Sequence, residues 1–410
     1  MKIIMLLPFC QVQRWLASNE FLSRNELNNI LIFRYIFFIQ VNIDDAIEQC
    51  YNHRSIRRRF ILIKVVDLFC GAGGLTHGLQ KSGLNVVAGY DIDAACRFAY
   101  EKNNKSLFVQ KSVTDIQDGE LQKYFDGAKV KVLAGCAPCQ PFSSYTNSAK
   151  LGVVRSKDKR WSLLYSFAKQ IETVKPDIIT MENVPRVVNH KVFKDFIKSL
   201  KKDGYFVWYD VVFCPDYGMA QSRSRLVLLA SKFGEIRLIP PTHEKGNYKT
   251  VKDIIGSLPE IEAGSGHIDD KLHRSASLSE INLKRIMASK PGGTWHDWPE
   301  DLRAKCHTKE SGSTYTAVYG RMSWDKLGPT ITTQCIGFGN GRFGHPVQNR
   351  ALSLREAALL QSFPEKYEFW PDDVKMEMST VARLIGNAVP VRLGEIVGDT
   401  ILKHISEVEI

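Results

Sequence analysis

The chain has 410 residues, of which 44% are hydrophobic, and its 55 lysines and arginines exceed its 44 aspartates and glutamates to give a formal net charge of +11. The hydrophobic share supports a full core, which excludes a disordered chain, and the length allows one large domain plus a smaller one. The positive charge favours a polyanionic partner, with nucleic acid the first candidate, although a basic balance can also serve solubility alone.

Neither the cysteines nor the N-terminal segment carries a specific functional signal. The nine cysteines lack the spacing of a disulfide framework and their number is odd, which favours reduced thiols in a cytoplasmic enzyme. Residues 1–10 resemble a signal peptide without a cleavage site, and the apolar residues 30–41, interrupted by Arg34, are too short to span a bilayer. We therefore expect no membrane association and interpret residues 1–60 as an accessory extension that activity does not require.

The first informative pattern is a strand followed by a glycine-rich turn. Residues 60–66 form a β-branched run typical of a central parallel strand, and the sequence DLFCGAGGLT follows at 67–76. Its glycines allow a ligand to approach the backbone closely, but Thr76 stands where a strict dinucleotide fingerprint has its last glycine. A second predicted strand ends at Asp91, whose carboxylate can bind ribose hydroxyls, and Asp115 after a third suits either the amine of adenine or an ordinary surface turn. The pattern predicts a nucleoside-containing cofactor and favours S-adenosylmethionine over NAD.

A second pattern places a thiol at the end of a buried strand. The apolar residues 130–133 predict a strand, and the sequence GCAPCQPFSS at 135–144 follows it. Cys139 would then lie at the rim of the sheet, where ligands bind in open α/β folds. Two other interpretations stay open at this point: a buried structural cysteine, and a redox or zinc pair with Cys136. Zinc is disfavoured because the sequence contains no matching second pair of ligands, and Pro141 suits a loop better than the helix of a redox pair.

A carboxylate and two arginines follow in the same half of the chain. Residues 162–174 show helical periodicity, and the strand predicted next delivers Glu182 to the same rim as Cys139. A carboxyl at a desolvated rim can stay protonated, although Glu182 could equally cap a helix. Arg223 and Arg225 enter a further strand two residues apart, so they are expected on one face, where buried arginines need anionic or carbonyl partners.

Six motifs in one order carry a family resemblance. They are DLFCGAGG, PCQPFS, ENV, QxRxR, the stretch RALSLREAALLQSFP and IGNAVP. Together they resemble the DNA cytosine-5 methyltransferases of bacterial restriction–modification systems over about residues 61–408. Cys214-Pro215 and Met219-Ala220 depart from the residues common in that family, and the N-terminal extension is unusual for it.

The resemblance implies an α/β fold with two domains. A Rossmann-like S-adenosylmethionine-dependent methyltransferase domain is expected to be discontinuous, at residues 61–239 and 347–410. A smaller, mostly β or irregular target-recognition domain is expected at residues 240–346. Within it, residues 314–319 and 329–333 predict strands.

Two helices are expected after the recognition segment. Ser353 followed by Glu356 is a capping box that predicts the start of a helix. A last helix over residues 391–403 is expected to return the chain to the cofactor side.

The implied chemistry explains the residue types. Addition of the Cys139 thiolate to C6 of cytosine would activate C5, and a protonated Glu182 would donate to N3 while Arg225 holds O2 and the carboxyl together. Arg223 is expected beside the catalytic loop in support. A base inside a duplex must be flipped out to reach the thiol. No residue is assigned as the base that removes the C5 proton, and no metal is expected.

Further residues are expected to bind the cofactor and the DNA. The cofactor residues would be Phe69, Gly71, Gly73, Asp91, Ile92, Asp115, Ile116, Pro138, Leu163, Asn387 and Val389. Candidate DNA contacts are Ser143, Arg160, Arg321, Thr330, Gln334, Asn340 and Arg342. For Arg321, Gln334, Asn340 and Arg342, contact with phosphate is favoured over contact with a base. The basic loop over residues 140–161 suits either a lid that grips phosphates or a solvated loop.

The sequence thus predicts a monomeric, cytoplasmic enzyme that acts on double-stranded DNA in the nucleoid and is paired with a restriction endonuclease. A tRNA cytosine-5 methyltransferase of the same fold is the first alternative, disfavoured by the long Gly-rich recognition segment. A catalytically silent DNA-binding protein is the second, disfavoured because Cys139 and Glu182 are both present.

Overall fold

The computed structural model describes residues 61–138, 162–305, 307, 309, 312 and 315–408. The chain divides between Ile61 and Leu62, so the fold described below is that of the second unit, Leu62–Ile410. The expectations for residues 1–60 and for the basic loop at 140–161 lie outside the described residues.

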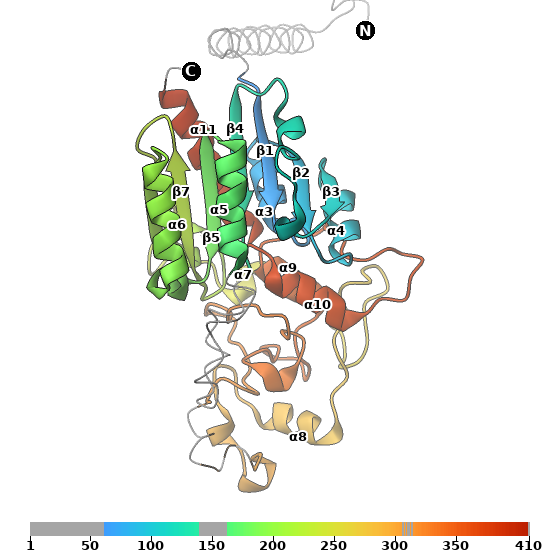
Figure 1. Ribbon diagram of the computed structural model, residues 1–410. Helices are drawn as coiled ribbons and strands as arrows, with labels where there is room; N and C mark the ends of the chain where they lie inside the picture. The colour runs from blue at the N-terminus through green and yellow to red at the C-terminus, as the bar shows by residue number, and fades with distance from the viewer. Residues whose placement is uncertain are drawn as a thin grey trace, which may run out of the picture. The chain divides into compact units, whose positions relative to one another are not determined.

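Within the described ranges, seven strands form one sheet in the order β3-β2-β1-β4-β5-β7-β6 (Figure 1). Strand β7 runs antiparallel to both of its neighbours, and the other pairings are parallel. The predicted α/β fold is therefore confirmed. The strands are β1 (Ile63–Leu68), β2 (Asn85–Asp91), β3 (Leu107–Gln110), β4 (Val130–Gly135), β5 (Ile178–Asn183), β6 (Phe206–Phe213) and β7 (Ser224–Ser231).

The strands follow the apolar runs of the sequence. All six residues of β5 are buried, and so are the last four of β1, because helices cover both faces of the sheet at these central positions. Strand β6 lies at one edge of the sheet and leaves Phe206, Tyr209 and Val211 exposed. The central strands therefore bring their carboxyl ends to one desolvated edge.

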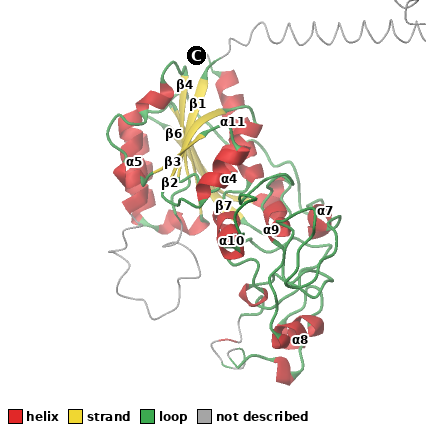
Figure 2. Cartoon of the chain, turned by 90° about the vertical axis from the view of Figure 1, so that its right-hand side faces the viewer, coloured by secondary structure: helices red, strands yellow, loops and turns green. Residues whose placement is uncertain are grey.

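Helices cover the two faces of the sheet (Figures 1 and 2). Helices α5 (Ser162–Val174) and α6 (Lys191–Lys202) lie on one face, where the rings of Phe167 and Phe196 stack at 5.8 Å. Helices α3 (Gly74–Lys81), α4 (Cys96–Asn103) and α11 (Val391–Glu407) lie on the other.

The last helix packs on the first helix of the sheet through glycines. A Cβ atom on Gly78 of α3 would lie 2.3 Å from the Val391 carbonyl oxygen, and one on Gly394 of α11 would lie 2.9 Å from the Leu75 carbonyl oxygen. Larger residues at either position would force the two backbones apart. This close packing connects the end of the chain to the glycine-rich turn, which immediately precedes α3.

The segment over residues 240–346 is mostly irregular. Among its described residues the α-helices are α7 (Val251–Ile255) and α8 (Glu280–Ala288), and the β-pairing consists of isolated bridges. The strands predicted at 314–319 and 329–333 are wrong: the described part of the first forms turns, and the second forms no strand. β-Branched residues favour a strand only where a neighbouring strand can pair, and here the Ile331 N–H donates instead to the side chain of Gln221 at 3.1 Å.

Two helices follow this segment, α9 (Leu354–Leu360) and α10 (Met378–Asn387). The predicted capping box at the start of α9 is confirmed: the Glu356 N–H donates to Ser353 Oγ at 3.1 Å and the Ser353 N–H donates to Glu356 Oε2 at 2.8 Å. The predicted last helix is also confirmed and ends four residues later than expected, at Glu407. Figure 1 shows the irregular segment beyond the carboxyl ends of the strands.

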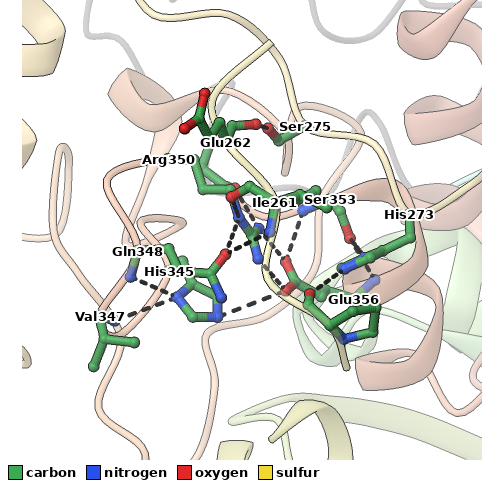
Figure 3. Close-up of polar contacts among 12 residues, drawn as sticks. Ile261, Glu262, His273, Ser275, His345, Val347, Gln348, Arg350, Ser353 and Glu356 are labelled. Atoms are coloured by element: carbon green, nitrogen blue, oxygen red, sulfur yellow. Dashed lines mark hydrogen bonds and ion pairs between the residues drawn. The ribbon is translucent and has the colours of Figure 1, made fainter. Parts of the chain in front are cut away.

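The capping carboxylate belongs to a buried ion pair (Figure 3). Arg350 donates to both oxygens of Glu356 at 2.7 Å, and each side chain is 1% exposed. Arg350 Nε also donates to the Ile261 carbonyl at 3.2 Å, and His345 Nε2 lies 3.7 Å from Glu356 Oε1. The pair therefore joins the start of α9 to the irregular segment.

None of the helices in the part of the chain that the structure describes has the length and apolarity needed to span a membrane.

Candidate active site

Three neighbouring strands end side by side at the candidate site. Leu68 at the end of β1 pairs with Gly135 at the end of β4, and Gly135 pairs with Met181 of β5. The residues that follow in each chain segment are therefore brought to the same edge of the sheet. They include Cys136, after β4, and Glu182, near the end of β5.

Glu182 is held from both sides. Its side chain is buried, with only 7% of the residue exposed. The thiol of Cys136 lies 2.9 Å from Glu182 Oε2, and Arg225 Nε lies 2.9 Å from Glu182 Oε1. Asn183 Nδ2 donates to the Ala137 carbonyl at 3.1 Å, which ties β5 to the segment leading to Cys139. Cys139 itself lies outside the described residues, and the exposed Pro138 is the last residue before it that the structure describes.

The two arginines expected on one face have different partners. Arg225 pairs with Glu182, whereas the buried Arg223 donates to the Ile331 carbonyl at 3.1 Å and to the Ala388 carbonyl at 3.4 Å. Arg223 therefore holds two chain segments beside the site, and the supporting role expected for it stays a prediction.

Gln221, the first residue of the QxRxR motif, has a structural role that the sequence did not predict. Its side-chain nitrogen donates to the Leu360 carbonyl at 2.8 Å, and its side-chain oxygen accepts the Ile331 N–H. Gln221 and Arg223 thus fasten the irregular segment to β7, while Arg225 serves the carboxylate. Gln221, Arg223 and Arg225 differ in role because their partners differ. Those partners are distant in sequence, so no local pattern predicts them.

The glycine-rich turn after β1 adopts an unusual backbone. Phe69, Gly71 and Gly73 all have positive φ values, of 63°, 52° and 87°. A Cβ atom on Gly73 would lie 2.4 Å from Asn104 Nδ2, whereas one on Gly71 would meet nothing within 4 Å. Gly71 therefore borders open space where a ligand can approach the backbone.

Asp91 orders this turn. Its Oδ2 accepts the Gly71 N–H at 2.9 Å and its Oδ1 accepts the Asp93 N–H at 2.9 Å. Burial raises the pKa of the Asp91 carboxyl, and the two N–H donors oppose that effect. Asp91 at the end of β2 and Gly71 after β1 are thus brought together, as one cofactor site requires.

The other predicted cofactor residues lie along the same edge or just behind it. Ile92 is 70% exposed, which is unusual for an isoleucine beside a buried strand end. Asp115 is exposed after β3, whereas Ile116 is buried in the core. Leu163 lies partly buried in the first turn of α5, and Asn387 is exposed at the last position of α10.

Val389 approaches the glycine-rich turn from the far end of the sequence. It is 6% exposed, and a Cβ atom on Gly74 would lie 2.3 Å from its carbonyl oxygen. Its contact with the turn is therefore made by the backbone, at the N-terminus of α3.

Two buried residues beside the turn were missed. Asp67, at 0% exposure, accepts a hydrogen bond from Thr76 Oγ1 at 2.7 Å, and burial raises its pKa to about 7. Tyr367 donates its hydroxyl to the Ala72 carbonyl at 2.6 Å from a segment nearly three hundred residues away. The acid that ends β1 was a detectable signal for Asp67, but nothing local marks Tyr367.

Comparison with known proteins decides the family. The model of the C-5 cytosine-specific DNA methylases matches residues 63–403. The chain belongs to this family. The Type II methylase M.HgiDII of Herpetosiphon aurantiacus is 52% identical over 344 residues, which cover 83% of this chain and 95% of that protein. M1.HphI of Haemophilus parahaemolyticus, a Type II methyltransferase, is 32% identical over 82% of this chain and 86% of its own length.

A solved structure shares the fold of this methylase. A candidate DNA modification methyltransferase encoded within an E. coli prophage aligns with a TM-score of 0.62 at 20% identity, over 84% of this chain and 99% of that one. The predicted membership of the bacterial restriction–modification type of DNA cytosine-5 methyltransferase is thus confirmed, and with it the prediction of an enzyme.

One of the DNA contacts predicted for this methylase, Arg321, is buried inside the protein. Arg321 is 4% exposed and donates to the carbonyls of Ile286, Ser289, His345 and Gln348 and to the Asn349 side chain, so its guanidinium is occupied within the protein. The DNA-binding role predicted for Arg321 is therefore withdrawn, because removing a buried, fully engaged guanidinium from its partners would be costly.

The remaining DNA candidates keep their status as predictions. Gln334 and Asn340 are exposed, and Arg342 is half-buried with a hydrogen bond to the Gly293 carbonyl. Thr330 donates to the Ser222 carbonyl at 2.6 Å, so it anchors its segment to the Gln221–Arg225 stretch. Ser143 and Arg160 lie outside the described residues.

Proposed function

We propose that this methylase transfers a methyl group from S-adenosylmethionine to C5 of a cytosine flipped out of a specific duplex sequence. The observation that carries the proposal is the buried carboxyl of Glu182, held between Arg225 and Cys136 directly beside the segment that leads to Cys139. We further propose that the enzyme acts as a monomer on DNA in the cytoplasm and protects that DNA from a cognate restriction endonuclease. The description of its family favours DNA over the tRNA alternative.

The residues at the edge of the sheet fit S-adenosylmethionine, which supplies an electrophilic methyl group when bound. The open side of Gly71 leaves room for a ligand against the backbone. Asp91 presents a carboxylate that already orders the turn, and Ile92 presents an exposed apolar side chain suited to the face of a nucleobase. Asp115, exposed after β3, would accept the amine of adenine.

The protein residues proposed to act on cytosine have separate tasks. The Cys139 thiolate adds to C6, and the ring electrons move toward N3, where Glu182 donates a proton. Arg225, paired with Glu182, stabilises the charge that develops at O2. After C5 carries the methyl group, the N3 proton returns to Glu182. A base then removes the C5 proton, and its electron pair forms the C5–C6 double bond as the C6–S bond breaks and Cys139 leaves as a thiolate. Arg223 supports the site through its contacts with Ile331 and Ala388.

The proposal is tested by replacing the nucleophile. Cys139→Ala is expected to abolish transfer of labelled methyl groups to DNA while leaving DNA binding intact, because only the covalent step is lost. Cys335→Ala, which removes a thiol buried in the irregular segment, serves as the control and should remain active. Methyl transfer by the Cys139→Ala variant would show that another group is the nucleophile.

A trapping experiment examines the covalent step directly. Duplex DNA with 5-fluorocytosine at the target should form a denaturation-resistant adduct with the wild-type enzyme, because fluorine blocks the elimination that releases the thiol. Peptide mapping should place the adduct on Cys139. An active enzyme that yields no adduct would argue against the covalent route, and bisulfite sequencing of DNA from expressing cells would identify the methylated cytosine.

A further inference from the structure

Cys136 lies closer to the acid of the site than its sequence position suggests. It follows β4 directly, and its N–H donates to the Leu68 carbonyl at 3.2 Å, which fixes its backbone to the end of β1. Its thiol points to the neighbouring strand, where Sγ lies 2.9 Å from Glu182 Oε2. The parallel register that pairs Gly135 with Met181 brings the next two residues, Cys136 and Glu182, alongside each other.

Arg225 alone does not fix the carboxyl group of Glu182. Its Nε lies 2.9 Å from Oε1, while its Nη1 donates to the Ser224 carbonyl at 2.8 Å, so the guanidinium fork is divided between two partners. A single contact leaves the carboxyl free to rotate about its last side-chain bond, which has only a broad torsional preference. The thiol of Cys136 supplies the second contact, on the other oxygen.

The two contacts also decide which oxygen can carry a proton. Oε1 lies 2.9 Å from Arg225 Nε, and the positive charge of the guanidinium disfavours a proton on this oxygen. Oε2 faces a thiol, which is a weak donor, and a carboxylic hydroxyl can accept from a thiol while donating its own proton elsewhere. Because Glu182 is 7% exposed, a well-defined set of partners rather than bulk water determines its orientation.

We propose that Cys136 is a positioning residue for the methylation reaction: its thiol donates to Glu182 Oε2 and orients that oxygen as the one that delivers the proton to the flipped base. The inference rests on the function proposed above and adds the role of a second cysteine to it. Cys136 does not touch the base and is distinct from Cys139, the proposed nucleophile.

The test compares two substitutions at one position. Cys136→Ala removes the donor and should lower kcat by roughly two- to tenfold, as expected for loss of one hydrogen bond, with KM for DNA and for S-adenosylmethionine unchanged. Cys136→Ser retains a donor of similar size and should restore kcat toward the wild-type value. Cys335→Ala controls for loss of a buried thiol elsewhere in the fold and should leave kcat unchanged.

A second measurement examines the steps before elimination. The rate at which the enzyme forms its trapped adduct with 5-fluorocytosine DNA reports addition to the ring and methyl transfer together, before the elimination that completes a turnover. This rate should fall in Cys136→Ala by the same factor as kcat and recover in Cys136→Ser, while the thermal midpoint of unfolding stays close to that of the wild type.

Three outcomes would overturn the inference: wild-type kcat in Cys136→Ala, equal loss in Cys136→Ala and Cys136→Ser, or a fall in kcat that merely follows a lower thermal midpoint or a higher KM. Failure of the function itself looks different, because the wild-type enzyme would then transfer no methyl group to DNA.

Discussion

At the scale of single residues, three acids near strand ends differ in what surrounds them: Asp67 and Glu182 are buried, and Asp91 is partly buried. Asp67 at the end of β1 has one hydroxyl donor, Thr76, and Asp91 at the end of β2 has two backbone N–H donors. Glu182 near the end of β5 has an arginine and a thiol. Three acids of one sheet thus have different surroundings, and a carboxyl's neighbours decide which groups it binds and how readily it holds a proton.

For Asp91 we expect Asp91→Ala to weaken binding of S-adenosylmethionine. The substitution removes the acceptor of the Gly71 and Asp93 N–H groups and any bond to the ribose, at a cost of roughly 1–3 kcal/mol, or about a 5- to 150-fold rise in Kd. Titration calorimetry measures this change in Kd. Asp118→Ala serves as the control because the Asp118 carboxylate is exposed and pairs with an exposed Lys169. An unchanged Kd would place the ribose contact elsewhere.

For Asp67 we expect a pH-dependent cost in stability. Burial raises its pKa from the usual 3.8 to about 7, so between these values the folded state holds a proton that the unfolded state has released. The stabilisation from this protonation is complete below pH 3.8 and is lost as the pH rises to about 7, by up to about 4 kcal/mol. The Asp67→Asn variant has no ionisable group at this position, so its stability should not show this dependence on pH.

Urea denaturation of both proteins between pH 4 and pH 8 checks this expectation. The free energy of unfolding of the wild type should fall relative to that of Asp67→Asn up to about pH 7 and run parallel to it above. Parallel curves over the whole range would contradict the assignment.

At the scale of elements, the start of α9 is the junction between the irregular segment and the helices that follow. The Glu356 carboxylate caps the helix through Ser353 and binds Arg350 with two hydrogen bonds of 2.7 Å (Figure 3). His345 packs beside it with a pKa lowered to about 4 by burial, so this ring is neutral at physiological pH and the charge of Glu356 is balanced by Arg350. One carboxylate therefore supports the cap and the ion pair together.

Removal of this carboxylate should be costly. Glu356→Ala leaves Arg350 buried without its counter-charge and is expected to lower the free energy of unfolding by about 3–5 kcal/mol. The matched control is Glu280→Ala, which breaks an exposed pair with Lys284 and should change stability by less than about 0.5 kcal/mol. Urea denaturation distinguishes the two, and equal effects would show that the buried pair contributes no more than a surface pair.

At the scale of the whole molecule, all residues of the candidate site lie in the part of the chain that the family model covers. That match begins at residue 63, where β1 also begins, and it ends at residue 403 within α11. The first and last helices of this region, α3 and α11, pack on each other through glycines beside the glycine-rich turn that follows β1. The first and last helices of the region are therefore fixed to each other, and we expect the region to fold without the residues before Leu62.

We accordingly expect a chain that lacks residues 1–58 to keep its methyl transfer activity. The truncated and full-length proteins should show comparable methylation of the same DNA, measured with labelled S-adenosylmethionine. Circular dichroism should confirm that the truncated protein is folded. A folded but inactive truncation would show that the extension takes part in binding DNA or the cofactor.

Local sequence patterns predicted much of the fold and part of the candidate site. Buried β-branched runs predicted the central strands, an acid and glycines after the first strand marked the cofactor turn, and Ser353 with Glu356 marked a helix start. Each of these patterns can be recognised in the sequence because the structure it predicts depends on residues only a few positions apart, through side-chain periodicity, turn geometry or a capping hydrogen bond. The same locality let the ordered motifs identify the family before any contact was known.

The tertiary structure decided what depends on residues distant in sequence. It buried Arg321 among carbonyls, separated the tasks of Arg223 and Arg225, and left the predicted strand at 329–333 without a pairing partner. It also brought the thiol of Cys136 into contact with Glu182. That contact depends on the register of β4 against β5. The physical reason is that a charge, a thiol or a strand acquires its role from whatever the fold packs against it, and that partner is not encoded nearby.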